Sequence, residues 1–396
     1  MIDILHISCS IPIDDYGSFG VFHRHYHNLP TDQFRVRPVS NHSFFSSMPA
    51  DEFPDRIALP TRKAWWPPVQ PFGLIKPVFY RARFRLLARE LDRHIDRSRP
   101  HVVVTHLWDF YSFFAAYYAQ SRALPLVTFL HDNLYDWLNG EDEKSNARHW
   151  VRQALDYSSR VFSISPELIA ELSGPHSVKC EVLPPMPQPT APARRKPLNS
   201  GPGIVHAFAG KRFPGIDDLL SDLATQIEAR GDKLVLIGES NELTLKLNAK
   251  HPATVSSTPK FAKSEEAMRY LAGIADRLIV AYPLIQATER SAWSSLRSSF
   301  PSRLVEYAQL NLPVLIFCDK QQALAKWCAR KQYPWIATEF SPASIKSMLE
   351  GLDAEEATKA AIGFWHKLAI DEFSPDVIQS RFMHALKEAA ATNRHA

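Results

Sequence analysis

A basic and an acidic side chain stand three residues apart in the otherwise largely apolar stretch "SSFPSRLVEYAQLNLPVLIF", residues 298–317. Pro301 suits the first turn of a helix, where no backbone N–H is needed, so a helix is predicted to begin near it. Arg303 and Glu306 then share one helical face, and the branched apolar run that follows predicts a buried strand. Two interpretations are open: a surface ion pair, or a carboxylate held at a ligand site.

Two cations follow a predicted strand in "HAFAGKRFPGIDDLL". Gly210 opens a turn there, and Lys211 and Arg212 come directly after it. Cations at the carboxyl end of a parallel strand, beside the free amides of the next helix, can clamp a diphosphate. The alternative is a pair of solvated loop cations.

A second glycine-containing loop, "CSIPIDDYGSFGVFHRHYHNL", follows the first predicted strand. Gly17 and Gly20, after Asp15, allow a tight turn and a close backbone approach to an anion, although such a spacing is often only a turn. His23 and His27 lie one helical turn apart, as zinc ligands can, but the sequence shows no third ligand. No metal site is predicted.

Other polar residues end predicted strands. Gly238 and Glu239 end "LVLIGE", Tyr282 ends "RLIVAY", and His131 and Asp132 end "PLVTFLHD". Because ligands of open α/β sheets bind beyond the carboxyl ends of the strands, these residues are candidates for a binding crevice. For His131 the alternative is a histidine that merely caps a strand end.

The elements that must position these residues alternate along the chain. Apolar runs predicted as strands are separated by amphipathic helical stretches such as "RFRLLARELDRHI", which is the βαβ pattern of doubly wound parallel sheets. The proline-rich segment 184–203 predicts a linker. We therefore expect an α/β protein with two Rossmann-like doubly wound domains facing across a cleft, residues 1–183 and residues 204–373.

Composition limits the function classes. With 396 residues, 45% of them hydrophobic and 22% charged, the chain is predicted to be globular. A formal net charge of +4 argues against nucleic acid as the main partner. The four cysteines have no metal or redox spacing, and no leader or membrane span is predicted, so we expect a cytoplasmic protein.

The basic residues are concentrated in the segment 62–99. It holds ten Lys or Arg against three acids, interleaved with aromatic residues. Such a segment can rest on an anionic membrane with its aromatic rings at the interface. The alternative is a solvated helix whose apolar side packs on its own domain. A peripheral position on the inner face of the cytoplasmic membrane is therefore one expectation.

The succession "HAFAGKR", "LVLIGE", "RLIVAYPL" and "PSRLVEYAQLNLPVLI" resembles the donor domain of GT-B glycosyltransferases, particularly the retaining family four (glycosyltransferases group 1) and its relatives. The first half resembles their acceptor domain more loosely, through "HVVVTHLWDF", "PLVTFLHDN" and "RVFSISPELIAEL". The last helix, residues 374–396, resembles the family's carboxyl-terminal helix, which packs back on the first domain.

The resemblance implies roles for single residues. Glu306 would accept hydrogen bonds from the ribose hydroxyls of a nucleotide sugar, and Arg303 would lie near the diphosphate with the amides around Ser302 and Leu304. A histidine at the place of His131 lies near the donor sugar and acceptor hydroxyl in the family. Many members carry a further glutamate eight positions before the one at 306, where this chain has Ser298.

We therefore predict a metal-independent, retaining glycosyltransferase. It would use a nucleotide-diphosphate sugar as donor substrate, no cofactor, and a saccharide or lipid-linked saccharide acceptor of bacterial surface polysaccharide or lipid-linked oligosaccharide synthesis. The alternatives are a nucleotide-sugar epimerase or hydrolase on the same fold, and a non-catalytic nucleotide-sugar-binding subunit. The expected site residues, beside His131 and Asp132, are Asp15, Gly17, Gly20, Gly210, Lys211, Arg212, Gly238, Glu239, Tyr282, Ser302, Arg303, Leu304 and Glu306.

Overall fold

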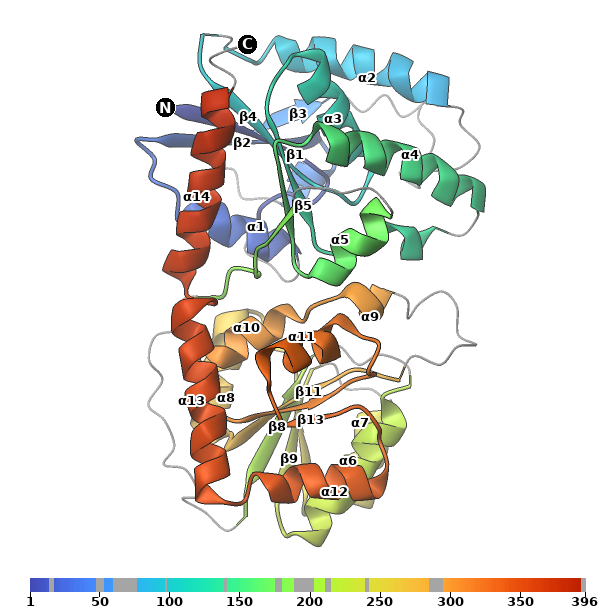
Figure 1. Cartoon of the computed structure of the whole chain (residues 1–396), viewed down its shortest axis with the longest axis vertical. Helices are drawn as coiled ribbons and strands as arrows, with labels where there is room; N and C mark the ends of the chain where they lie inside the picture. The colour runs from blue at the N-terminus through green and yellow to red at the C-terminus, as the bar shows by residue number, and fades with distance from the viewer. Residues whose placement is uncertain are drawn as a thin grey trace. The chain divides into compact units, whose positions relative to one another are not determined.

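The structure is a computed structural model of the whole chain (Figure 1). It describes residues 1–13, 18–47, 53–59, 77–96, 98–138, 141–174, 180–188, 203–210, 215–238, 242–284 and 295–392. The chain divides into two compact units. Unit 1 contains Met1–Met186 together with two later segments, Ser291–Ser299 and Ile378–Ala396; unit 2 contains Pro187–Arg290 and Phe300–Val377.

Unit 1 is built on a seven-stranded parallel sheet of order β3-β2-β1-β4-β5-β6-β7. Its strands are β1 (Ile2–Ile7), β2 (Phe34–Asn41), β3 (Ile57–Leu59), β4 (His101–His106), β5 (Leu126–Leu130), β6 (Arg160–Ser163) and β7 (Cys180–Val182). Its helices are α1 (Ser18–His27), α2 (Pro77–Asp92), α3 (Phe110–Ser121), α4 (Glu141–Tyr157), α5 (Pro166–Ser173) and α9 (Ser295–Ser298), with the 3-10 turns η1 (Phe44–Ser47) and η3 (Leu134–Trp137).

Unit 2 is built on a six-stranded parallel sheet of order β10-β9-β8-β11-β12-β13. Its strands are β8 (Val205–Ala209), β9 (Lys233–Ile237), β10 (Val255–Thr258), β11 (Arg277–Ala281), β12 (Val314–Phe317) and β13 (Ile336–Ala337). Its helices are α6 (Asp217–Ala229), α7 (Glu242–Lys250), α8 (Ser264–Ile274), α10 (Ser302–Ala308), α11 (Ala323–Lys331), α12 (Pro342–Gly351) and α13 (Glu355–Asp371).

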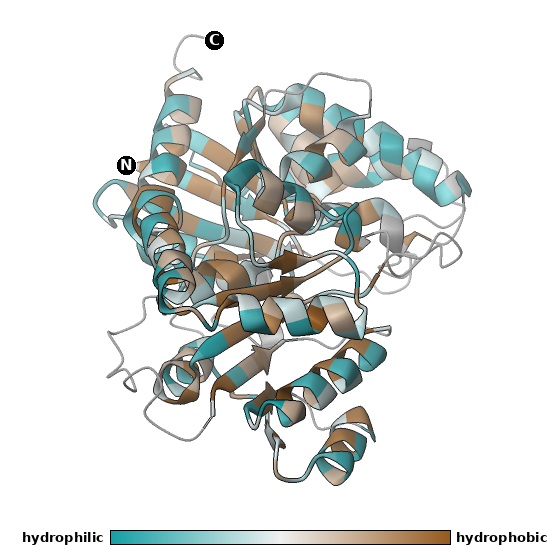
Figure 2. Ribbon diagram, turned by 60° about the horizontal axis from the view of Figure 1, so that its bottom comes forward, coloured by the Kyte–Doolittle hydropathy of each residue, from teal (hydrophilic) through white to brown (hydrophobic). Residues whose placement is uncertain are grey.

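Both sheets are covered by helices, and this explains their sequences. The inner strands β4, β5, β11 and β12 are buried along their whole length, so they read as continuous apolar runs rather than alternating ones. Figure 2 shows mainly brown strands between helices that carry teal on their outer sides. The doubly wound α/β fold expected from the sequence is confirmed.

Strand order locates where each unit should bind a ligand. In unit 1 the order reverses between β1 and β4, and in unit 2 between β8 and β11. Adjacent loops diverge at such a switch point, which leaves a crevice beyond the carboxyl ends of the strands. The site residues should therefore be sought at these two edges.

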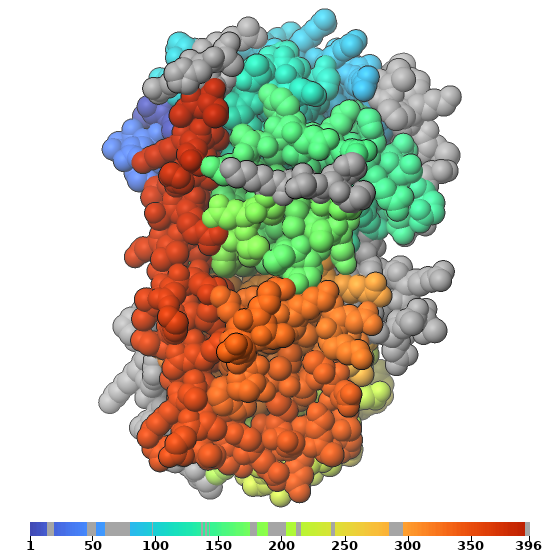
Figure 3. Space-filling view, viewed as in Figure 1, coloured from blue at the N-terminus to red at the C-terminus, as the bar shows by residue number. Residues whose placement is uncertain are grey.

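The last helix, α14 (Pro375–Thr392), packs on unit 1 from residue 378 onward. Ile378, Phe382 and Leu386 join the core formed by β1, β4 and β5. Gln379 donates its amide to the His25 carbonyl at 3.0 Å, and Arg381 pairs with Glu181. Figure 3 shows this helix in red, with one side open at the surface of the molecule.

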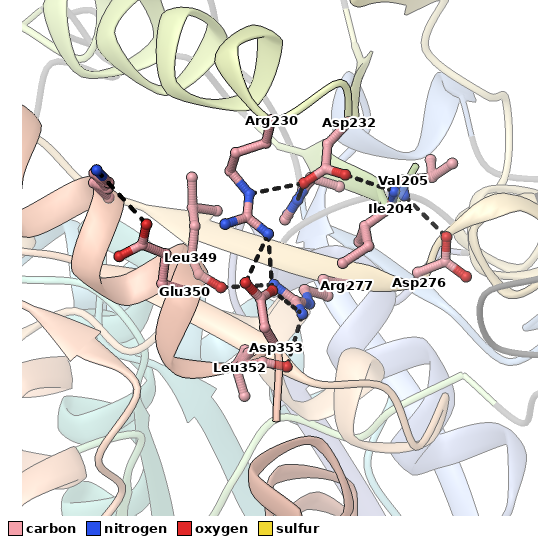
Figure 4. A network of polar contacts seen from close by, with 12 residues as sticks. Ile204, Val205, Arg230, Asp232, Asp276, Arg277, Leu349, Glu350, Leu352 and Asp353 are labelled. Carbon is pink, nitrogen blue, oxygen red and sulfur yellow. Dashed lines mark hydrogen bonds and ion pairs between the residues drawn. The ribbon is translucent and has the colours of Figure 1, made fainter. Parts of the chain in front are cut away.

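A polar network fixes the opposite, amino edge of the unit 2 sheet (Figure 4). Arg277 of β11 donates to the carbonyls of Leu349 and Leu352 at the end of α12 and to Asp353. Arg230, after α6, joins Asp353 to Asp232. These contacts hold the amino ends of the strands together and leave the carboxyl edge for other groups.

No helix within the described ranges is long and apolar enough to cross a membrane.

Candidate functional site

Three loops meet at the carboxyl edge of the unit 2 sheet. Gly210 follows β8 and Gly238 follows β9. Gly238 has φ of +149°, which favours glycine, and a Cβ there would lie 3.4 Å from the Gly210 carbonyl oxygen. Gly215, with φ of +84°, lies beside Pro283 after β11, where a Cβ would approach the Pro283 Cβ to 3.4 Å. The structure therefore brings together the strand ends that the sequence singled out.

Tyr282 stands at the same edge, directly after β11. Its amide donates to the Phe317 carbonyl at the end of β12 at 2.8 Å, and only 8% of its surface is exposed. Gln322 donates to the next carbonyl, that of Pro283, at 3.3 Å. These contacts fix the loop after β11 against the end of the neighbouring strand.

Glu306 is not a surface residue: it lies on the buried side of α10, with 7% of its surface exposed. The Ser264 hydroxyl, in the first turn of α8, lies 2.9 and 3.0 Å from the two oxygens of its carboxylate and donates to it. The next residue, Tyr307, donates its hydroxyl to the Ala209 carbonyl at 3.1 Å, which ties α10 to the end of β8. The buried carboxylate is thus placed beside the strand that leads to Gly210.

The other residues of α10 differ in exposure. Ser302 is exposed, Arg303 is half-buried, and the Leu304 side chain is fully buried. The Leu304 amide donates to the Pro301 carbonyl at 2.9 Å. The helix begins at Ser302, as the proline predicted. The predicted residues Asp15, Gly17, Lys211, Arg212 and Glu239 lie outside the described residues.

In unit 1, His131 follows β5 at the carboxyl edge. It is half-buried, and its ring stacks on Phe22 of α1, with centroids 5.5 Å apart. Burial lowers its pKa to about 4, so the imidazole is neutral near pH 7. Asp132 follows it and is also half-buried. Gly20 lies within α1 rather than in the preceding loop, and its carbonyl accepts from Arg24 Nε at 3.0 Å.

Two further histidines end strands next to His131, and the sequence analysis did not select them. His6 of β1 bonds the Tyr26 hydroxyl through Nδ1 and the Ser10 carbonyl through Nε2, both at 2.8 Å. Since a carbonyl only accepts, Nε2 carries the proton. His106 of β4 lies 3.0 Å from the Ser10 hydroxyl through Nδ1, and its ring lies 5.2 Å from that of His131.

Both of these histidines are neutral. Burial lowers the pKa of His6 to about 4, and burial together with the neighbouring histidines lowers that of His106 well below its usual range. A histidine at or near the carboxyl end of two adjacent apolar strands, "IDILHIS" and "HVVVTHL", is the signal that could have identified them.

Asp109 caps α3 at the same edge. Its side chain accepts from the amides of Cys9 and Ser112, both at 3.0 Å, and Ser112 completes the capping box. Burial raises the pKa of Asp109 and that of the Cys9 thiol. The thiol is therefore protonated and not a nucleophile at neutral pH.

The two histidines of the first helix stack on each other. The rings of His23 and His27 lie 5.5 Å apart on α1. In the part of the chain that the structure describes, no three His, Cys, Asp or Glu side chains are grouped as metal ligands would be.

Comparison with known proteins agrees with this architecture. Residues 34–186 match the model of the glycosyl transferase 4-like domain family. No curated protein matches the chain at the level of sequence.

Several solved structures share the fold over nearly the whole chain. A glycosyltransferase from Rickettsia africae has a TM-score of 0.66 at 11% identity, covering 98% of each chain. HepE from Anabaena, in complex with UDP and glucose, has a TM-score of 0.62 at 13% identity, covering 98% of this chain and 100% of that one. WaaG, a glycosyltransferase of lipopolysaccharide biosynthesis, has a TM-score of 0.55 at 15% identity, covering 96% and 99%. The chain thus has the fold of the GT-B glycosyltransferases.

Proposed function

We propose that this protein transfers a sugar from a nucleoside-diphosphate sugar to an acceptor hydroxyl. Two findings support this: residues 34–186 match the glycosyl transferase 4-like domain family, and the chain has the GT-B fold. Unit 2 would bind the nucleotide at its carboxyl edge, and unit 1 would bind the acceptor. The transfer as proposed uses no cofactor and no divalent metal, and it retains the configuration of the sugar.

The observation that carries this proposal is the buried carboxylate of Glu306. Burying a carboxylate is costly unless it receives hydrogen bonds, and the hydroxyl of Ser264 is one donor to it. A ribose diol would supply two more donors to a carboxylate in this place. The neighbouring turns at Gly210 and Gly238 allow a close approach of the backbone to a diphosphate.

The leaving diphosphate needs positive charge, because its charge grows as the glycosidic bond breaks. We assign this to Lys211 and Arg212, the cations directly after Gly210, and to Arg303. His131 would hydrogen-bond the donor sugar or the acceptor hydroxyl as a neutral imidazole, because burial keeps its pKa near 4.

Titration calorimetry with UDP, GDP and ADP, on the full chain and on Glu306→Gln, tests the proposal. The amide replaces one charged acceptor by a donor, so the affinity for the cognate nucleotide should fall by about 1.5–3 kcal/mol. Glu265→Gln is the matched control, because Glu265 lies next to Ser264 but pairs outward with Arg269. If Glu306→Gln and the parent bind the nucleotide with equal affinity, Glu306 does not bind the ribose. Donor turnover without any acceptor would instead favour an epimerase or hydrolase.

We further propose that α2 rests on an anionic membrane, so that a lipid-linked saccharide can reach unit 1. Arg81, Arg85 and Arg89 recur every four residues and are all exposed, and Leu86 beside them is 66% exposed. An arginine row with an exposed apolar residue suits a surface of anionic headgroups. Of the aromatic residues of the predicted membrane segment 62–99, Tyr80 and Phe84 are buried in unit 1 and face no membrane, and those in 62–76 lie outside the described residues.

Flotation with liposomes of phosphatidylglycerol and phosphatidylethanolamine tests this contact. Replacing the three arginines of α2 by glutamine should abolish flotation at physiological salt, at about 1 kcal/mol lost per arginine. Replacing the exposed Arg148 and Arg152 of α4 is the control. Equal flotation of the two variants would assign α2 to ordinary packing.

A further inference from the structure

The carboxyl edge of unit 1 carries a half-exposed tryptophan that the proposed chemistry does not use. Trp108 stands two residues after His106, at the end of β4 and next to the switch point. Its ring lies nearly parallel to the His106 ring, at 9° and with centroids 6.1 Å apart. His106 is only 1% exposed, so the indole is held against a buried neighbour while part of it remains in solvent.

His106 itself has an unfilled hydrogen-bonding position. Nδ1 pairs with the Ser10 hydroxyl, whereas Nε2 is buried and has no partner within the described part of the chain. A buried polar atom without a partner is costly, so such atoms often mark a place that a ligand or water completes. The two rings next to it, Trp108 and His131, are both half-exposed.

The charges at this edge disfavour an anion. Within the described residues of the loops after β1, β4 and β5 (8–13, 107–109 and 131–133) there is no Lys or Arg, and there are two aspartates, Asp109 and Asp132. The amide of Ser112 at the start of α3 is already bonded to Asp109. Arg24 of α1 is nearly buried and donates Nε to the Gly20 carbonyl. The three histidines at this edge are neutral near pH 7 because burial lowers their pKa values.

We propose that this edge of unit 1 binds an uncharged sugar ring of the acceptor, with Trp108 as its stacking surface and the imidazoles of His106 and His131 as hydrogen-bond partners of its hydroxyls. The C–H groups on one face of a pyranose are weakly positive and attract the negative face of an indole. Neutral imidazoles suit hydroxyl groups, which both donate and accept. The proposal rests on the proposed function, because it names the class of acceptor that unit 1 would take.

Saturation-transfer NMR on the full chain tests it. The probes are the methyl glycosides of glucose, mannose and galactose, and separately the hexose monophosphates of glucose and mannose. We expect signals from ring protons of at least one methyl glycoside, and weaker binding of the phosphates. Trp108→Ala should weaken glycoside binding about tenfold or more, and Trp108→Phe should restore most of it. Tyr117→Ala removes another half-buried ring of unit 1, on α3, and should leave binding unchanged.

Three results would overturn the proposal: no signal from any methyl glycoside, tighter binding of the hexose monophosphates, or full glycoside binding by Trp108→Ala. A UDP titration of the same samples separates this inference from the proposed function. If the parent does not bind UDP, the donor assignment in unit 2 is wrong, whereas the difference in glycoside signal between the parent and Trp108→Ala reports on unit 1.

Discussion

Unit 1 should lose stability in mild acid, because it buries histidines in their neutral form. His6 is fully buried and His25 is 1% exposed, and burial lowers their pKa values to about 4 and about 3. In the unfolded chain a histidine titrates near 6.5. Below that pH the unfolded state binds more protons than the folded state, so stability that is complete above pH 6.5 falls as the pH decreases towards 4.

The magnitude follows from the two shifts. Each of these histidines contributes about 1.36 kcal/mol per pH unit below 6.5, which is about 2 kcal/mol at pH 5. Two of them give about 4 kcal/mol, a large part of the 5–15 kcal/mol typical of a domain. His106 acts in the same direction, whereas the raised pKa of Asp109 opposes it at the acid end of the range.

Hydrogen exchange of β1, β4 and β5 in increasing urea, corrected for the intrinsic pH dependence of exchange, gives the free energy of opening of unit 1 at each pH. In His25→Gln the slope of this free energy against pH between 6 and 5 should fall by about 1.36 kcal/mol per pH unit. His384→Gln is the control, because that side chain lies on α14 and is 73% exposed. A parent opening free energy that is constant from pH 8 to pH 5 would refute the reasoning.

Three more predictions concern single contacts. His131→Ala should keep nucleotide affinity within about threefold and lower transfer about a hundredfold or more, as separate calorimetric and turnover measurements would show; intact transfer would make His131 structural. Ser264→Ala removes the described donor to Glu306 and should lower nucleotide affinity about threefold or more in calorimetry; an affinity equal to that of the parent would show that this hydrogen bond does not position the carboxylate. Asp353→Asn should cost unit 2 about 1–3 kcal/mol in urea denaturation, whereas Glu350→Gln, which removes a pair at 3.8 Å, should cost less than about 0.5 kcal/mol; equal losses would show that the network in Figure 4 does not stabilise the sheet.

The sequence predicted the inner strands well and the outer ones poorly. The runs "PLVTFLHD", "LVLIGE" and "RLIVAY", selected as strands, contain β5, β9 and β11, because a strand buried on both faces is apolar at every position. β2, "FRVRPVSN", was missed because it carries Arg35, Arg37 and Pro38 and is only partly buried in its first half. Arg35 is stabilised by Asp55, which lies twenty positions further along the chain, and local patterning cannot show such a contact.

Site residues could be predicted from the sequence only one strand end at a time, without the contacts between them. Glu306 was selected from its own segment, but its partner Ser264 starts a helix 42 positions earlier with no motif around it. The sequence analysis quoted the strand end "HVVVTHLWDF", which contains His106 and Trp108, but did not select them as site residues. Their place in the site depends on contacts with the ring of His131 and the Ser10 hydroxyl. Contacts between different strand ends exist only in the folded sheet, which is why sequence spacing did not reveal them.

Ser298 is a further residue whose surroundings could not be predicted from the sequence. It occupies the position where the sequence analysis noted a missing glutamate. Many proteins of the family that this chain resembles have a glutamate there, touching the transferred sugar. Here Ser298 ends α9, is completely buried, and accepts a hydrogen bond at its carbonyl from the Ser165 hydroxyl that also caps α5. A carboxylate at this position would be buried, a state that costs several kcal/mol unless the carboxylate is paired or hydrogen-bonded. The Ser298 carbonyl therefore takes part in the packing of unit 1, whereas its hydroxyl is buried without a hydrogen-bond partner among the described residues.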